Sequence, residues 1–199
     1  MSGPHESEDD SDPSNVLSRA REYHYRKLNK WEAEAVRRIS TTLARARIEH
    51  DHIFFVLGSF EEGSRGKLKE LQTLIDEWEG TDCKAFLMDD LGGDVEGDIY
   101  GLMKFRVIAD EIDHVIGVCE HDRGGFLIEQ GIISTVDRYT DRSHLLKRKY
   151  GEEQEREQYS WMQSSGVFRV FAFKERLLEW RNDSEFLAVS RALLRKLTE

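Results

Sequence analysis

The chain has 199 residues, of which 39% are hydrophobic and 34% are charged, and its formal net charge is -10 at pH 7. This length predicts one domain with additions, and the negative charge argues against nucleic acid and anionic membranes as partners. No apolar run approaches the length that crosses a bilayer, which is about 20 residues.

The first segment, residues 1–13, holds both prolines and five acidic residues but no Lys or Arg. This composition predicts a disordered acidic tail and is unlike a signal peptide. Cys83 and Cys119, the two cysteines of the chain, both lie in apolar runs, where cysteine behaves as a small hydrophobe. Two cysteines make no disulfide framework. Together these features predict a cytoplasmic location.

The second segment, residues 14–50, contains neither Gly nor Pro, and its apolar residues recur at steps of three and four. This spacing predicts a long N-terminal amphipathic helix. Its stripe also approximates a heptad pattern. Two alternatives follow: the helix packs on the body of its own chain, or it pairs with a second copy in a homodimer.

The remaining residues, 51–199, form one domain in which short apolar runs alternate with amphipathic stretches. Such alternation predicts parallel strands with helices on both faces and right-handed crossovers. The expected fold is therefore α/β, a flavodoxin-like open parallel five-stranded sheet of order 2-1-3-4-5. The expected strands are 52–58, 83–89, 114–119, 144–150 and 167–173, and the expected helices are 64–78, 99–109, 126–136, 152–163 and 175–197, the last broken near residue 183.

Ligands of such sheets bind at the carboxyl ends of the strands, near the switch in strand order. Here that position lies between the first and third strands. Glycines in the turns let a ligand approach the backbone, and those before a helix expose its first N–H groups. The residues expected to line this crevice are Gly58, Ser59 and Phe60 after strand one, Asp89 and Asp90 after strand two, and Asp122, Gly124 and Gly125 after strand three.

Glu129 follows one helical turn after the third-strand loop, and a side chain there leans back toward the crevice. A glutamate in the first turn of a helix is also favoured by the helix dipole alone. Glu129 therefore fits either a catalytic carboxylate or an ordinary glutamate that stabilises the start of a helix.

The stretches "FFVLGSF" and "DHVIGVCEHDRGGFLIEQG" resemble the nucleoside 2-deoxyribosyltransferase family and its TIR-like relatives. In that family a first strand ends in a Gly-containing turn, and a third strand starts with Asp and leads to an Asp-x-Gly-Thr loop. A glutamate followed by an apolar residue and Gly comes next. Gly58, Asp113, Glu129 and Gly131 occupy the matching places. The whole chain is also similar to uncharacterised archaeal proteins of this superfamily.

The resemblance implies cleavage of an N-glycosidic bond, with Glu129 as the nucleophile or the stabiliser of an oxocarbenium-like centre. Asp122 or Asp90 would orient the sugar hydroxyls or act as the acid. Ser59 with the amides of Gly124 and Gly125 would hold a hydroxyl or phosphate, and Phe60 would stack on the base. The chain departs from the family pattern in having Gly125 at the Thr position, Arg123 at the Asp position and Gln130 at the apolar one.

The expected ligand is a small molecule, a nucleoside or nucleotide. Residues 85–129 hold eleven acidic residues against three Lys or Arg, which favours an uncharged nucleoside. The alternative function is a non-catalytic module that binds the same ligand and signals through the N-terminal helix.

Other classes fit the sequence less well. "GSFEEGSRG" lacks the glycine spacing of a dinucleotide fingerprint, and the order of the strands puts the acidic pair in the wrong place for a receiver domain. His114, His121 and His144 lack zinc-ligand spacing, so they are interpreted as satisfied or surface residues. We expect no cofactor and no metal ion.

Overall fold

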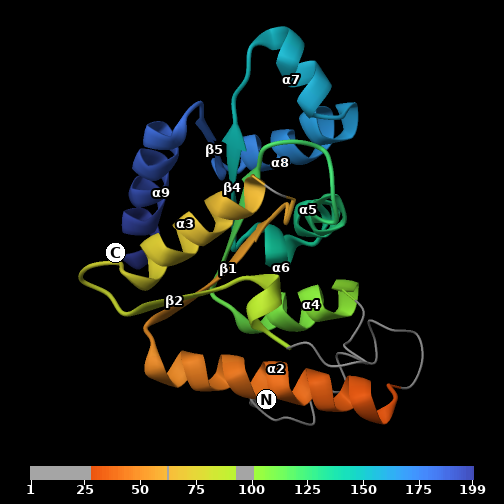
Figure 1. Ribbon diagram of the computed structural model, residues 1–199, viewed down its shortest axis with the longest axis vertical. Helices are drawn as coiled ribbons and strands as arrows, with labels where there is room; N and C mark the ends of the chain where they lie inside the picture. The colour runs from red at the N-terminus through yellow and green to blue at the C-terminus, as the bar shows by residue number, and fades with distance from the viewer. Residues whose placement is uncertain (1–27, 62, 93–100) are drawn as a thin grey trace, which may run out of the picture.

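The computed structural model describes residues 28–61, 63–92 and 101–199, and a five-stranded sheet lies at its centre (Figure 1). All strand pairs are parallel, and the order is β2-β1-β3-β4-β5. The open parallel sheet and its predicted order are therefore confirmed. The strands are β1 (His52–Gly58), β2 (Cys83–Phe86), β3 (His114–Cys119), β4 (Ser143–Arg148) and β5 (Leu177–Trp180).

Helices cover both faces of the sheet, which explains why β1 and β3 are apolar along nearly their whole length. One face packs against α2 (Lys30–Glu49), α4 (Gly101–Glu111), α5 (Phe126–Thr135), α6 (Asp137–Thr140) and α8 (Phe168–Phe173). The other packs against α3 (Ser64–Asp76) and α9 (Asp183–Thr198). The short helix α7 (Glu152–Gln158) buries none of its residues and lies beyond the end of β4 (Figure 1).

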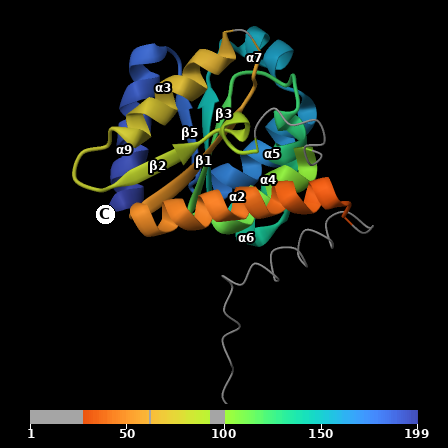
Figure 2. The same cartoon turned by 60° about the horizontal axis from the view of Figure 1, so that its bottom comes forward.

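The N-terminal helix packs on the body of its own chain. Its apolar stripe, which includes Val36, Ile39 and Leu43, is buried, and α2 runs beside α4 (Figure 2). Its start differs from the expectation of an unbroken helix over 14–50, which is wrong at Asn29. The Asn29 side chain accepts hydrogen bonds from the first turn while Glu32 bonds back to the Asn29 N–H, a capping box that begins the helix at Lys30. Residues 14–27 and the predicted tail 1–13 lie outside the described residues.

The fifth strand lies later in the chain than the sequence pattern predicts. Residues 167–173 belong to a helical segment, a π-helical turn (Gln163–Val167) followed by α8, and the strand is Leu177–Trp180, so the prediction for 167–173 is wrong. Phe168 and Phe171 are buried three residues apart on one helical face, whereas Phe173 is 91% exposed. A short apolar run fits a buried strand and a buried helix equally well. The break predicted near residue 183 is the start of α9, where the Asn182 side chain caps the helix.

Asp113 joins three elements at the amino end of the sheet. Its Oδ2 accepts a hydrogen bond from the Ile53 N–H at 2.9 Å, and its Oδ1 lies 3.3 Å from Nη2 of Arg47 at the end of α2. The same Arg47 nitrogen donates to the Glu111 carbonyl at 2.9 Å. The aspartate that leads the third strand therefore fastens β3 to β1 and to the N-terminal helix.

Histidines gather at this amino end. The rings of His52 and His114 lie 5.6 Å apart, and His144 is 3% exposed with its Nδ1 unpartnered among the described residues. Burial lowers the pKa of His114 to about 4. Burial, with Arg176 and Lys196 nearby, lowers the pKa of His144 to about 3. The His114 and His144 imidazoles are therefore neutral near neutral pH.

Both cysteines are free and buried, as their apolar surroundings predict. Burial raises the pKa of Cys83 to about 11 and raises that of Cys119 further. Both side chains are therefore protonated thiols in the folded chain. No helix within the described residues is long and apolar enough to cross a membrane.

Candidate functional site

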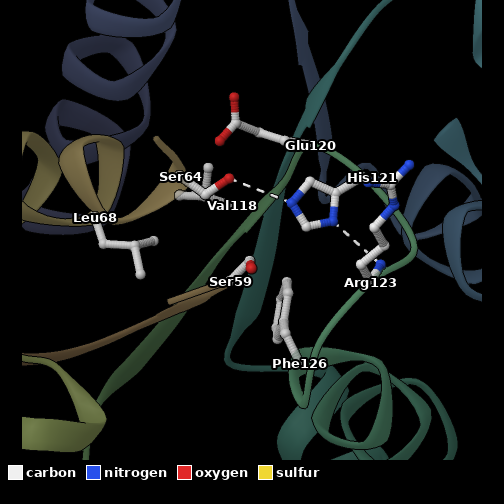
Figure 3. A pocket seen from close by; sticks show the side chains of 8 residues that line it. All are labelled: Ser59, Ser64, Leu68, Val118, Glu120, His121, Arg123 and Phe126. Carbon is white, nitrogen blue, oxygen red and sulfur yellow. Dashed lines mark hydrogen bonds between the residues drawn. The ribbon is translucent and has the colours of Figure 1, made fainter. Parts of the chain in front are cut away.

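A narrow hollow lies at the carboxyl ends of β1 and β3, at the switch in strand order (Figure 3). It holds about 230 Å³ of space between atoms, but no part of it is wide enough for a water-sized sphere. The first turns of α3 and α5 and the loop after β3 close around it. Its lining is Ser59, Ser64, Leu68, Val118, Glu120, His121, Arg123 and Phe126.

Two glycines let these segments approach one another. A Cβ on Gly58 would lie 2.6 Å from Cδ2 of Leu68 and 3.1 Å from the Val118 carbonyl oxygen, so a side chain here would push on α3 and on β3. Gly124 has a φ of +82° and brings the loop after β3 over Ser59, whose Oγ would lie 3.4 Å from a Cβ there. Gly125 is exposed and has an ordinary helical φ of -65°. Gly58 and Gly124 therefore serve close contacts between segments of the chain, whereas a Cβ on Gly125 would have nothing within 4 Å.

His121 points into the hollow and was not recognised from the sequence (Figure 3). Its Nδ1 accepts a hydrogen bond from the Arg123 N–H at 3.1 Å. Because Nδ1 accepts, the ring proton is placed on Nε2, which lies 3.3 Å from the Ser64 Oγ and 3.8 Å from Oε2 of Glu61. His121 is thus a hydrogen-bond donor toward the hollow. It is not poised as a base that would activate Ser64.

The two residues after β1 take different positions. Ser59 is buried, and its Oγ accepts a hydrogen bond from the Glu61 N–H at 3.2 Å. Phe60 is partly exposed under the guanidinium of Arg65, which lies 5.7 Å from its ring centre. Arg65 also bonds to Asp89 at 2.9 Å, so Phe60 and Asp89 meet through one arginine rather than across a cavity.

Asp90 is engaged by its own turn. Its Oδ2 accepts hydrogen bonds from the Leu87 N–H at 2.8 Å and from Nε2 of Gln72 at 2.5 Å, so this carboxylate holds the exit of β2 against α3. Neither Asp89 nor Asp90 lines the hollow. The acidic residues that follow in the sequence, Asp94, Glu96 and Asp98, lie outside the described residues.

Glu129 lies in the first turn of α5, as predicted, and is half-buried. Its Oε2 is buried and has no hydrogen-bond partner among the described residues, and burial raises the pKa of this carboxyl. Gln130, the next residue, faces the π-helical turn and accepts a hydrogen bond from Nε2 of Gln163 at 3.0 Å. Because successive helical residues are about 100° apart, Glu129 points to a different side of α5 from Gln130. It is not part of the hollow's lining.

The loop after β3 is bonded to the segment around α7 by contacts that no sequence motif predicted. The Tyr150 hydroxyl donates to the Glu120 carbonyl at 2.7 Å, and the Asp122 N–H donates to the Gln158 carbonyl at 2.7 Å. The Glu120 carboxylate also lies 3.1 Å from Nη1 of Arg148 at the end of β4. Asp122 is thus held on the side of the loop that faces α7.

In chemical terms the hollow offers one imidazole N–H and a buried hydroxyl, and the partly desolvated acid Glu129 lies outside its lining. Within the described ranges, no three His, Cys, Asp or Glu side chains gather as a metal site requires. The comparisons with known proteins add one match. Residues 1–158 match a family of unknown function (DUF8170). No curated protein and no solved structure matches the chain.

Proposed function

The chain belongs to the DUF8170 family, and we propose that it hydrolyses or transfers at the N-glycosidic bond of a nucleoside or nucleotide. The observation that carries the proposal is the state of Glu129. A buried carboxylate oxygen without a partner is costly, and such groups concentrate at functional sites. Its place, one turn into the helix that follows β3, also matches the resemblance in sequence.

Cleavage of this bond requires a carboxylate at the anomeric carbon and a proton donor for the leaving base. Glu129 attacks or stabilises the anomeric carbon as the bond from that carbon to the base nitrogen breaks, and the base leaves with the electron pair and a proton. Water or a second base then attacks the anomeric carbon and releases the carboxylate. Since Asp90 is committed to its own turn, Asp122 is the predicted acid left to supply that proton. The Nε2–H of His121, opposite an accepting Nδ1, offers a hydrogen bond rather than a proton.

The alternative is a module that binds a nucleoside or nucleotide without turnover. Two observations favour it. The hollow is narrow, so a nucleoside enters only if the loops part, and such a movement is itself a signal. Arg47 and Asp113 also join the end of α2 to the start of β3, the strand whose far end leads into the hollow. Binding at one end of β3 could therefore alter the N-terminal helix at the other.

The deciding experiment measures free base after incubation with a panel of nucleosides, nucleotides and NAD. We expect base release from at least one uncharged nucleoside. Glu129→Gln should lower the rate by at least about a thousandfold while binding is retained. Glu79→Gln, which changes an exposed glutamate elsewhere on the surface, should act as the wild type. Full activity of Glu129→Gln would remove the assignment.

The same panel of ligands distinguishes a binding module from an enzyme. If no base appears but one ligand raises the melting temperature, the chain is a binding module. A ligand-dependent change in amide hydrogen exchange of α2 would then be expected. Exchange confined to the loops around the hollow would contradict signalling through the N-terminal helix.

A further inference from the structure

A second and larger hollow lies at the end of β4, between the strand exit and α7. It is an open groove with a volume of about 770 Å³, within the range of small-molecule sites. It shares no lining residue with the hollow between β1 and β3. Its walls are formed by the residues that follow β4, by one side of α7 and by the start of the helical segment that leads to α8.

Three aromatic residues line this groove, and two of them are fixed. The Tyr159 hydroxyl lies 2.8 Å from the Cys119 carbonyl and 2.7 Å from that of Arg148, and its ring packs edge-on against Phe168. Tyr150 is held by the Glu120 carbonyl. The aromatic wall is therefore organised before any ligand arrives, which lowers the entropic cost of binding.

The third aromatic residue, Trp161, is 76% exposed. Two other tryptophans use their indole N–H within the fold, Trp78 on the Thr198 hydroxyl and Trp180 on the Leu146 carbonyl. Trp161 meets no ring or cation among the described residues. A large aromatic side chain left in water at the rim of a groove is a natural surface for stacking a planar ring.

The charged residues of the groove already have partners. Lys149 lies 3.0 Å from Glu179, Arg156 lies 2.7 Å from Glu152, and Glu155 is bonded to Lys147. An ionic ligand would therefore have to displace a partner from one of these pairs. An uncharged ligand needs only the stacking surface and the hydroxyl of Ser164, which also lines the groove.

We propose that this α7 groove binds an uncharged planar heteroaromatic molecule, of the size of a nucleobase or nucleoside, stacked on Trp161. The site is separate from the one at Glu129, and the inference does not depend on catalysis there. The groove is connected to the loop after β3 by two tyrosines. Tyr150 is bonded to the Glu120 carbonyl and Tyr159 to the Cys119 carbonyl, where β3 leads into that loop. Occupation of the groove would hold that loop in place.

The test uses the full chain labelled with 5-fluorotryptophan, in which the four tryptophans give separate fluorine signals. Adenine and adenosine serve as uncharged probes, AMP as an anion and choline as a cation. We expect the uncharged probes to shift the Trp161 signal saturably at millimolar concentration or below. Calorimetry should show binding at the groove weakened about tenfold or more in Trp161→Ala, the usual cost of losing one stacking partner.

Two controls make the result specific. Trp31→Ala removes another exposed tryptophan, 63% exposed on α2 and far from the groove, and should leave the affinity unchanged. Glu129→Gln should leave the shift of the Trp161 signal unchanged, so failure at one site is distinguishable from failure at the other. An unmoved Trp161 signal, or equal affinity in Trp161→Ala, would overturn the site. Tighter binding of AMP or choline than of adenosine would overturn the uncharged class.

Discussion

The two ends of the sheet both bury a titratable side chain with an unpartnered atom, but the cost of that burial appears at different pH. At the amino end His144 is buried with a lowered pKa, so it is neutral at pH 7 and carries no charge that burial would penalise. At the carboxyl end burial raises the pKa of Glu129, so the cost grows as this carboxyl ionises. At neutral pH the cost of burial therefore lies at the end of the sheet where ligands of this fold bind.

The largest expected effect is acid sensitivity that arises at the amino end. Because the folded-state pKa of His144 is lowered, unfolded chains take up protons first as the pH falls. Stability is therefore full above pH 6.5 and is lost below it. Between pH 6.5 and 4, His144 should cost roughly 3 kcal/mol of unfolding free energy, since each pKa unit is worth about 1.4 kcal/mol.

Urea denaturation across this pH range measures the effect. His144→Leu should flatten the slope, because it removes the titration and leaves an apolar side chain in the same buried place. Protonation of ion-paired carboxylates also lowers the unfolding free energy in this pH range. The quantity to compare is therefore the difference in slope between wild type and variant. Equal slopes in the two proteins would mean that the cost of burial does not lie at His144.

A middle-sized effect tests the packing that leads to the carboxyl end. A Cβ on Gly117 would lie 2.7 Å from Cζ of Phe126 and 2.7 Å from Cδ2 of Leu145, so Gly117→Ala should destabilise the protein by about 1–3 kcal/mol. Gly131→Ala is the matched control, because a Cβ at that position, inside α5, would have nothing within 4 Å. There alanine should stabilise by about 0.5–1 kcal/mol. Thermal or chemical denaturation of both variants compares them directly.

The smallest effect sharpens the comparison at the other end. Glu129→Gln removes the charge that burial disfavours, so the variant should be more stable than the wild type at pH 7 by on the order of 1 kcal/mol. The sign follows from the raised pKa: burial favours the protonated acid, and stability is lost as the pH rises through its folded-state pKa. The gain should therefore shrink toward pH 4.5. A variant less stable than wild type at pH 7 would show that Glu129 has a stabilising partner.

The sheet was predictable because its first three strands are largely apolar runs closed by glycine or acidic residues. The fourth has only Leu145 and Leu146 at its centre and ends before Gly151. The fifth was not predictable, because residues 167–173 satisfy both periods and only tertiary packing places Phe168 and Phe171 inside a helix. The position of Glu129 at the start of α5 followed from chain order alone. The direction of His121 did not, since it depends on the Arg123 N–H, a contact set by loop geometry. The α7 groove carries no motif and is visible only in three dimensions.

The alkylation rates of the two buried thiols report how often two different parts of this sheet open. Cys83 belongs to the edge strand β2 and Cys119 to the interior strand β3, and each stays protonated and inert to alkylating reagents while its surroundings remain closed. Fraying of the edge would expose Cys83 alone, whereas modification of Cys119 requires the middle of the sheet to open. The ratio of the two alkylation rates therefore separates local loosening from global unfolding, and the chain's own cysteines suffice for the measurement.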